Sequence, residues 1–483
     1  MIRRITAVLI LLLLLLSASC ENGTGDAEGS VVNGTSRGGE SVVNGETDIS
    51  VPIGKAIVMN GTKTLKSDKK RFELINYQNL TEALSVGGTK KKAAFGEAAD
   101  QVAAITYLAD VVTAPGGYTY AVYHNIETED GSDTTFDVFV ADESGWKKCG
   151  TCVTTPSTAK WVDEGRAYIY HPSLIGIAAD DASNAYIFSY SGGKVVASVY
   201  DLSADSFTVS ADVIPMNMKT EYQKISAYYD RSAGNRGSIV VMCRNNADLE
   251  FYRFDIETGR FTDDFEFWYA RSVKSVYYFC VHDGDIILVW ETARNGDLCW
   301  CIIKDAFTEK SEVTEACLHK STQHFEGSVS VGENVSLENC WGGVAFDGQG
   351  NTHIIVQYSN TEYSAHGRND SIFLRYYLVG KDGSFEYYDL DDKLFGNAAN
   401  EPYCGGVFIR DGECCYIEKK RIVPHTIALC RIKDGKSELI DMIDIPNNVE
   451  YIQMRSNGTD VIFQTETPDK AFWYFQIRFP DQK

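Results

Sequence analysis

From about residue 111 to the C-terminus, short runs of Tyr, Phe, Val and Ile alternate with tight, polar turns. One such unit has an apolar run at 343–346, a turn at 347–351, a run at 353–358, a loop, a run at 372–378 and a turn at 381–384. β-branched and aromatic residues suit a pleated strand, and Asp, Asn and Gly tolerate the positive φ of tight hairpins. The pattern therefore predicts three strands and two tight turns in this unit.

Six other segments fit the same frame, so first strands are expected near residues 111, 175, 225, 276, 343, 407 and 451. Units of roughly 45 to 65 residues with about four short strands each are typical of a β-propeller. We therefore predict an all-β fold, a single propeller with seven blades, although six or eight blades also fit. A pair of β-sandwiches is the alternative, and the even spacing disfavours it.

The last unit shows three strands before the chain ends at Lys483. An N-terminal strand, at 55–59 or 72–77, would supply the missing outer strand and protect an exposed sheet edge. Residues 96–110 read either as a short helix or as the end of that closing strand. The propeller is thus predicted to span residues 51–483.

The N-terminus has the pattern of an export signal. Arg3 and Arg4 precede an apolar run at 5–16, too short to cross a bilayer, and the run is followed by Ser17-Ala18-Ser19-Cys20. Residues 1–20 resemble a bacterial lipoprotein signal peptide, with Ser17 where leucine is usual. The resemblance implies lipidation of Cys20 and a lipid anchor in a bacterial membrane, facing the periplasm or the cell surface. An ordinary secretory signal peptide is the alternative, and it also implies export.

Residues 21–50 are rich in Gly, Ser, Asn and Thr, and the pentapeptide Ser-Val-Val-Asn-Gly occurs at 30–34 and again at 41–45. This composition cannot bury enough apolar surface to fold alone. We predict a flexible linker that would hold the propeller about 30 Å from a membrane.

The charge balance limits the partners. The chain has 67 acidic and 45 basic residues, a net charge of −22. Nucleic acids and anionic lipid head groups require a basic surface, so neither is expected as a partner. We expect a monomer with no cofactor. Ca²⁺ is a candidate ion, because Glu127, Glu129, Asp130 and Asp133 form an acidic loop.

The chain has 13 cysteines. Cys149 and Cys152 form a CxxC pair, but it lacks the βαβ context of a redox motif and the second pair of a zinc site. We expect buried free thiols that pack as small hydrophobic residues, with disulfides as the alternative. Cys299 and Cys301 should share one face of a strand, whereas Cys414 and Cys415 should point to opposite faces.

Candidate site residues lie in the predicted long loops. In a propeller, the loop between the second and third strands and the loop between blades lie on one face, and such loops often carry function. Loops are predicted at 358–371, 418–426 and 307–341. They contain the ligand-binding candidates Tyr363, His366, Arg368, Arg421, His425 and Trp341. His319, His324 and Glu326 form a weaker candidate metal set.

Residues 347–358, with an Asp, a Gly-Asn turn and a strand containing His353, resemble a blade of the BNR/sialidase-like propellers. The resemblance implies an arginine triad, a tyrosine nucleophile with a glutamate partner, and an aspartate acid/base. The chain lacks a Phe/Tyr-Arg-Ile-Pro motif at the start of the propeller, since Arg-Ile-Val-Pro lies at 421–424, and it lacks a Ser-x-Asp-x-Gly-x-Thr-Trp box. Sialidase activity is therefore not expected, and we predict a structural role for His353.

Three functions remain open. The preferred hypothesis is a membrane-tethered propeller that recognises a glycan or protein through its loop-rich face. A polysaccharide hydrolase or lyase is the alternative, and a structural scaffold of the cell envelope is the second. Whether the chain is an enzyme stays open, and the missing motifs favour a binding protein.

Overall fold

The computed structural model describes residues 63–66, 73–84, 107–125, 134–142, 145–154, 160–163, 166–169, 175–215, 224–245, 248–267, 273–292, 297–320, 334–364, 367–390, 402–420, 423–445, 449–454, 460–465 and 472–478. The chain divides into two units, Met1–Glu46 and Thr47–Lys483, and all described residues belong to the second. The predicted signal peptide, Cys20 and nearly all of the linker fall in the first. Among the described residues, no helix is both long and apolar enough to cross a membrane.

The described part is all-β and forms a seven-bladed propeller, as predicted. Six blades are four-stranded antiparallel sheets. Blade 1 contains β3 (Tyr107–Thr113), β4 (Thr119–Asn125), β5 (Thr134–Asp142) and β6 (Gly145–Thr154), and blade 2 contains β9 (Ile175–Ala179), β10 (Ala185–Ser191), β11 (Lys194–Asp201) and β12 (Ser206–Pro215). Blade 3 contains β13 (Lys224–Asp230), β14 (Ser238–Asn245), β15 (Asp248–Asp255) and β16 (Arg260–Phe267), and blade 4 contains β17 (Val273–His282), β18 (Asp285–Thr292), β19 (Leu298–Lys304) and β20 (Glu312–His319). Blade 5 contains β21 (Asn334–Phe346), β22 (Thr352–Ser364), β23 (Gly367–Val379) and β24 (Phe385–Leu390), and blade 6 contains β25 (Pro402–Arg410), β26 (Glu413–Lys420), β27 (Val423–Lys433) and β28 (Lys436–Asp444). A two-stranded hairpin, β7 (Lys160–Asp163) and β8 (Arg166–Ile169), lies between blades 1 and 2 in the sequence.

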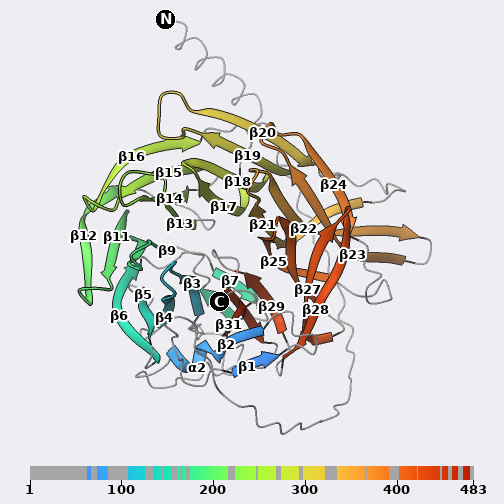
Figure 1. Ribbon diagram of the computed structural model, residues 1–483, viewed down its shortest axis with the longest axis horizontal. Coiled ribbons are helices and arrows are strands. Elements are labelled where there is room, and N and C mark those ends of the chain that lie inside the picture. Colours follow the sequence, from blue (N-terminus) through green and yellow to red (C-terminus); the bar gives the residue numbers. More distant parts are fainter. Residues whose placement is uncertain are drawn as a thin grey trace, which may run out of the picture. The chain divides into compact units, whose positions relative to one another are not determined.

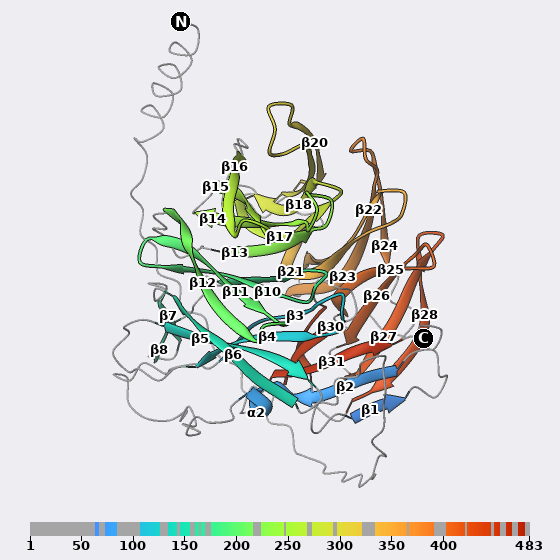
Figure 2. The same ribbon diagram turned by 60° about the vertical axis from the view of Figure 1, so that its left-hand side comes forward.

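Blade 7 joins the two ends of the propeller chain. Its strands are β29 (Val449–Met454), β30 (Asp460–Thr465), β31 (Phe472–Arg478), β2 (Glu73–Asn79) and β1 (Lys63–Lys66), in that order across the sheet. Figure 2 shows β30, β31, β2 and β1 next to one another. β2 pairs antiparallel with β31, with Leu74 opposite Ile477. This confirms segment 72–77 as the closing strand. The other candidate, 55–59, lies outside the described residues, and β1 was not predicted.

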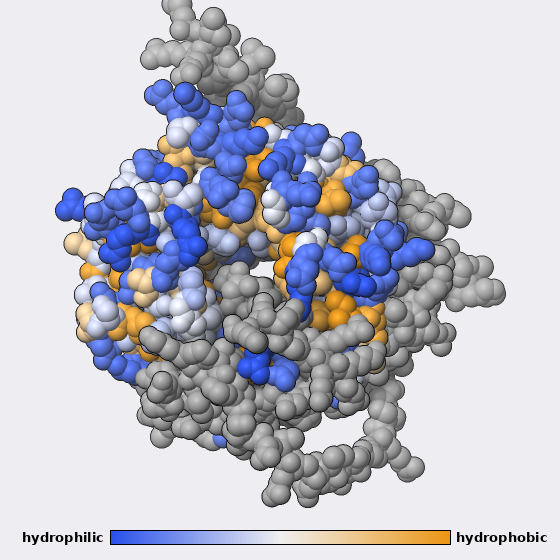
Figure 3. All heavy atoms as spheres, viewed as in Figure 1, coloured by the Kyte–Doolittle hydropathy of each residue, from blue (hydrophilic) through white to orange (hydrophobic). Residues whose placement is uncertain are grey.

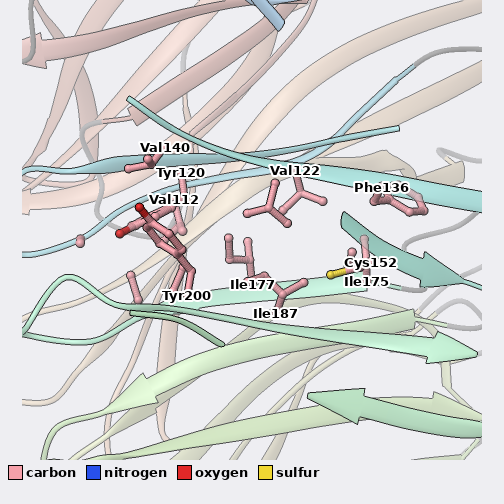
Figure 4. Close-up of a cluster of buried hydrophobic side chains, with 14 residues drawn as sticks. Val112, Tyr120, Val122, Phe136, Val140, Cys152, Ile175, Ile177, Ile187 and Tyr200 are labelled. Atoms are coloured by element: carbon pink, nitrogen blue, oxygen red, sulfur yellow. The ribbon is translucent and has the colours of Figure 1, made fainter. Parts of the chain in front are cut away.

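The first strand of each blade lies near the centre of the ring (Figure 1). Contacts link β3, β9, β13, β17, β21, β25 and β29 in sequence, and β30 returns to β3. In the described residues, seven clusters of buried apolar side chains lie one at each interface between neighbouring blades. Figure 4 shows the cluster between blades 1 and 2, where Val122 and Phe136 from one blade meet Ile177 and Ile187 from the next. Each blade is therefore stabilised on both faces by its neighbours, as expected of stacked repeats.

Three tight turns have the positive φ expected of Asp and Gly. Asp283, Asp411 and Asp434 all have φ near +50°, and each is followed by a glycine with positive φ. Two consecutive residues with positive φ give a turn whose twist matches that of the flanking strands. These turns fix the register of hairpins in blades 4 and 6.

The start of blade 1 corrects one expectation. Residues 107–110 begin β3, so they belong neither to a helix nor to the closing strand. Apolar alternation is weak there, and a register shift between Leu108 and Asp110 interrupts the pairing with β4. Residues 96–106 lie outside the described part.

Replacing Gly343 by alanine is expected to destabilise the propeller by about 1 to 3 kcal/mol, as overpacking does in a closed core. A Cβ on Gly343 would lie 2.5 Å from the backbone nitrogen of Val407 and 2.8 Å from the Cα of Gly406, in the first strand of blade 6. Gly348→Ala is the matched control, because a Cβ there meets no atom within 4 Å. Urea unfolding of both variants provides the measurement. Equal stabilities would contradict backbone contact between these blades.

Candidate functional site

The loop residues predicted as a ligand site occupy strands and tight hairpins. Tyr363 lies in β22 directly opposite Arg368 in β23, and Ser364 pairs with Gly367, so the expected loop at 358–371 is a long hairpin. His425 lies in β27 and Trp341 in β21. The side chains of these four residues lie outside the described part, as do His366 and Arg421. Their roles in binding stay predictions.

The loop assignments at 358–371 and 418–426 were wrong for a physical reason. Both stretches are polar and lack the apolar alternation that marks a strand. A two-stranded ribbon that extends beyond its sheet is held by backbone hydrogen bonds, and these leave no hydrophobic signal. The strands β22 and β23 therefore continue past the end of the apolar pattern.

The candidate metal set is also changed by the structure. His319 ends strand β20 instead of lying in a loop, and its ring packs edge-on against Tyr358 with centroids 4.9 Å apart. His324, Glu326 and the acidic loop at 127–133 lie outside the described residues. Within the described part, no group of three or more His, Cys, Asp or Glu side chains is arranged to hold a metal ion.

The eleven cysteines whose side chains the structure describes are free thiols, and nine of them are buried. Cys149 and Cys152 lie on β6, three residues apart along an extended strand. That spacing of about 10 Å exceeds the roughly 7 Å limit between the Cα atoms of a disulfide. Cys299 and Cys301 contribute to one cluster, whereas Cys414 and Cys415 contribute to clusters on opposite faces of blade 6, as predicted.

His353 stabilises the first turn of blade 5 through contacts of both ring nitrogens. Its Nδ1 lies 2.8 Å from the hydroxyl of Tyr376, and its Nε2 lies 3.3 Å from Asp347, whose carboxylate also accepts hydrogen bonds from Asn351. Burial lowers the pKa of His353, against the opposing effect of Asp347. The same construction recurs in blade 2. There Asp180 accepts from Asn184 and from the hydroxyl of Tyr186. Recurrence in a second blade fits the predicted structural role.

A cluster that the sequence analysis did not identify lies on the face of blade 5 that packs against blade 4. It comprises Tyr358 from β22, then Phe373, Arg375 and Tyr377 from β23, then Phe385, Tyr387 and Asp389 from β24. We call it the aromatic strip. In the sheet, Arg375 lies opposite Asp389, and Tyr377 lies opposite Tyr387. Alternate residues of a strand share a face, so the strip runs across three neighbouring strands.

Arg375 is the centre of the strip. Its guanidinium carbon lies 4.7 Å from the ring centroid of Tyr387, 5.1 Å from that of Tyr358 and 5.5 Å from that of Phe373. Its Nε and Nη2 donate to the two carboxylate oxygens of Asp389, with Nη2–Oδ2 at 3.0 Å. Cation–π contacts and a bidentate ion pair therefore fix this side chain in one orientation.

The electrostatics agree with the geometry. Burial alone would lower the pKa of Arg375, but the hydrogen bonds to Asp389 hold it above its ordinary value. Burial raises the pKa of Tyr358, whose hydroxyl lies 2.8 Å from that of Tyr377. The strip thus contains neutral phenols around one compensated charge pair.

The outer end of the strip is open to solvent. Tyr387 is 55% exposed and Phe385 is 38% exposed, and β24 is the outermost strand of its blade. Much of the described surface visible in Figure 3 is hydrophilic. Large exposed aromatic side chains on a rigid strand are a frequent feature of recognition surfaces. The arrangement can offer ring faces for stacking, a fixed guanidinium and a carboxylate that is 54% exposed.

A signal for this site is present in the sequence. Residues 385–390 read Phe-Glu-Tyr-Tyr-Asp-Leu, and 373–377 read Phe-Leu-Arg-Tyr-Tyr. In each segment, every second residue is aromatic or charged, and these residues share one face of the strand. They are Phe385, Tyr387 and Asp389 in the first segment, and Phe373, Arg375 and Tyr377 in the second. Only the pairing of β23 with β24, which the sequence does not reveal, brings the two segments together.

No protein-family model and no curated protein matches the chain. Among solved structures, it is similar to the β-propeller domain of the Trilobed protease from Pyrococcus furiosus, at 12% identity over 77% of this chain and 96% of that one, with a TM-score of 0.40. It is also similar to the α-L-arabinofuranosidase Arb93A from Fusarium graminearum, at 10% identity over 76% and 91%, with a TM-score of 0.39. The RRP9 WD40 repeats match at 8% identity over 78% and 99%, also with a TM-score of 0.39. Similarity at this level says nothing about ligand or reaction.

Proposed function

We propose that this protein is an exported recognition module that binds a glycan through the aromatic strip of blade 5. The observation that carries the proposal is the solvent-exposed Tyr387, held beside a guanidinium that Asp389 fixes in place. A sugar ring presents an apolar C–H face that stacks on an aromatic ring, and a rim of hydroxyls that bond to charged groups. The strip offers both kinds of partner within one rigid sheet.

Rigidity supports binding at this position. The strip lies on paired strands rather than on a loop, and its inner rings, Tyr358 and Tyr377, are fully buried against blade 4. A site held in place before the ligand arrives loses little conformational entropy on binding. The long hairpin that carries Tyr363 and Arg368 continues from the same two strands, β22 and β23, and would extend the site.

The proposal includes a lipid anchor at Cys20, supported by the charged, apolar and small-residue pattern of residues 1–20. Wild-type protein is then expected in the membrane fraction. Cys20→Ala protein is expected to leave that fraction or to stay unprocessed. Lipid labelling and fractionation of both proteins provide the test, and equal labelling would contradict the anchor.

Tyr387→Ala is expected to reduce glycan affinity by roughly 5- to 150-fold, on the scale of the about 1 to 3 kcal/mol that one nucleic-acid base gains by stacking on an aromatic side chain. The measurement is a glycan screen followed by titration of each hit. Tyr388→Ala is the matched control, since Tyr388 is the adjacent exposed aromatic residue but points to the opposite face of β24. Equal losses in both variants would show that the strip is not the site.

Product analysis of every hit by mass spectrometry separates the alternatives. Turnover of a bound glycan would identify a polysaccharide hydrolase or lyase instead of a binding protein. A structural scaffold would give neither binding nor turnover.

A further inference from the structure

The charged groups of the aromatic strip compensate each other. Arg375 donates two hydrogen bonds to Asp389, and its flat guanidinium faces three aromatic rings. Only 12% of its side chain is exposed. A carboxylate or sulfate on a ligand would need a free, exposed guanidinium edge, and Asp389 already occupies the fork that would bind it.

The charges close to the strip add negative potential. Strand β24 and the turn before it carry one basic residue, Lys381, and three acidic residues, Asp382, Glu386 and Asp389. Glu386 accepts a hydrogen bond from Tyr388 on the opposite face of the strand. On the neighbouring blade, Glu312 and Glu315 are exposed on β20. The whole chain carries a net charge of −22. An acidic polymer approaching this surface is therefore repelled both locally and at longer range.

Asp389 remains able to accept hydrogen bonds from a neutral ligand. A carboxylate has about four lone-pair sites, and Arg375 uses two of those on Asp389. Hydroxyl groups of an uncharged sugar are donors that fit the remaining sites, while the apolar sugar face covers Tyr387.

We infer that the ligand of the aromatic strip is a neutral polysaccharide and that Asp389 excludes acidic ones. The inference rests on the proposed glycan binding and adds the chemical class of the ligand. Asp389 is thus a specificity-determining residue. Removing its charge, while keeping its shape, should release Arg375 to bind anions.

The test uses the full-length protein and pairs of polysaccharides that share a backbone and differ in charge: methyl-esterified and de-esterified homogalacturonan, dextran and dextran sulfate, hydroxyethyl and carboxymethyl cellulose. Affinity electrophoresis at about 50 mM and about 500 mM salt gives the relative affinities, because salt screens ionic binding and leaves stacking nearly unchanged. We expect the neutral member of at least one pair to bind about tenfold more tightly than its acidic partner, with little salt dependence. Asp389→Asn should reduce that preference about tenfold, and Asp389→Glu should retain it.

The outcomes separate the inference from the proposed function. Tighter, salt-sensitive binding of acidic members would overturn the inference and leave glycan binding intact. An unchanged preference in Asp389→Asn would overturn the role of Asp389. If no member of any pair binds, both the proposed function and the inference are contradicted.

Discussion

A fragment that begins at residue 85 is expected not to fold, whereas a fragment that begins at residue 51 should fold as a propeller. The shorter fragment lacks β1, β2 and the short helix α2 (Leu80–Leu84). Leu74, Tyr77, Leu80 and Leu84 are all buried in the clusters on either side of blade 7. Removing a buried side chain of this size costs about 2 to 5 kcal/mol, so losing four costs about 8 to 20 kcal/mol, which is as large as the roughly 5 to 15 kcal/mol by which domains are stable.

The loss also exposes a sheet edge. Without β2, strand β31 would present unpaired N–H and C=O groups to solvent, which favours aggregation through edge pairing. Circular dichroism and size-exclusion chromatography of the two fragments provide the measurement. A monomeric 85–483 fragment with the same cooperative unfolding as 51–483 would show that the ring does not depend on its closing strand.

A single substitution in the full chain also tests the contribution of the closing strand to stability. Leu74→Ala should lower the free energy of unfolding by about 3 kcal/mol, because Leu74 is fully buried beside blade 6. Val209→Ala removes apolar atoms from an outer strand of blade 2, where the side chain is exposed, and should change stability by about 0.5 kcal/mol or less. Equal effects would contradict the burial of the closing strand.

The strands that could be predicted are those buried on both faces. Strand β18, with Ile286 to Trp290, and strand β22, with Ile354 to Val356, read as continuous apolar runs between turn residues. Such runs define the blade repeat, and the repeat defines the ring. The closing strand could be predicted for the same reason, because Leu74 and Ile75 keep an apolar pattern ahead of the first blade.

The strands that were missed lie at the outside of the blades. β16 reads Arg-Phe-Thr-Asp-Asp-Phe-Glu-Phe and β20 reads Glu-Val-Thr-Glu-Ala-Cys-Leu-His. An outer strand packs on only part of its surface, so its residues are largely polar and resemble a loop. For this reason the sequence pattern predicts one long inter-blade loop at 307–341 and places His319 in it, whereas the structure has strand β20 there.

The residues of the aromatic strip could not be predicted from the sequence. Of the predicted candidates, Tyr363 and Arg368 extend from the two strands that carry Tyr358 and Arg375, whereas His425 lies in β27 of blade 6. Tyr387 and Asp389 were missed, because they belong to an outer strand whose partner could not be identified. Cation–π contacts and ion pairs between strands depend on register, and register is a property of the folded sheet.

Stability is expected to fall as the pH rises from about 4.5 to about 8, because of one buried carboxyl group. Glu418 on β26 is 4% exposed and lies opposite Cys404 and Ala428 in the sheet. Burial raises its pKa from 4.5 to about 8, against the opposing effects of hydrogen bonds from Tyr416 and Cys430. In the folded protein the group is therefore protonated up to about pH 8, whereas in the unfolded chain it loses its proton near pH 4.5.

The direction of this change in stability follows from the number of protons that the folded and unfolded states bind. Between these two pKa values the folded state holds one more proton than the unfolded state, so raising the pH favours unfolding. Below 4.5 both states are protonated, and above 8 both are ionised, so the contribution of Glu418 is constant outside this window. A shift of this size corresponds to about 5 kcal/mol, since one pKa unit is worth about 1.4 kcal/mol.

Glu418→Gln replaces the carboxyl with a neutral group of the same shape and removes this titration. The variant should equal the wild type at pH 4 within about 1 kcal/mol and exceed it by up to about 5 kcal/mol above pH 8. Urea unfolding of full-length protein at pH 4, 6 and 8.5 gives the difference, which cancels the titration of all other groups. Glu315→Gln, at an exposed position on β20, should show no such dependence. A Glu418→Gln variant that is less stable than the wild type at pH 8.5 would mean that Glu418 is ionised and paired with a cation. Replacing an ionised, paired carboxylate by a neutral amide removes the ion pair and destabilises the folded state.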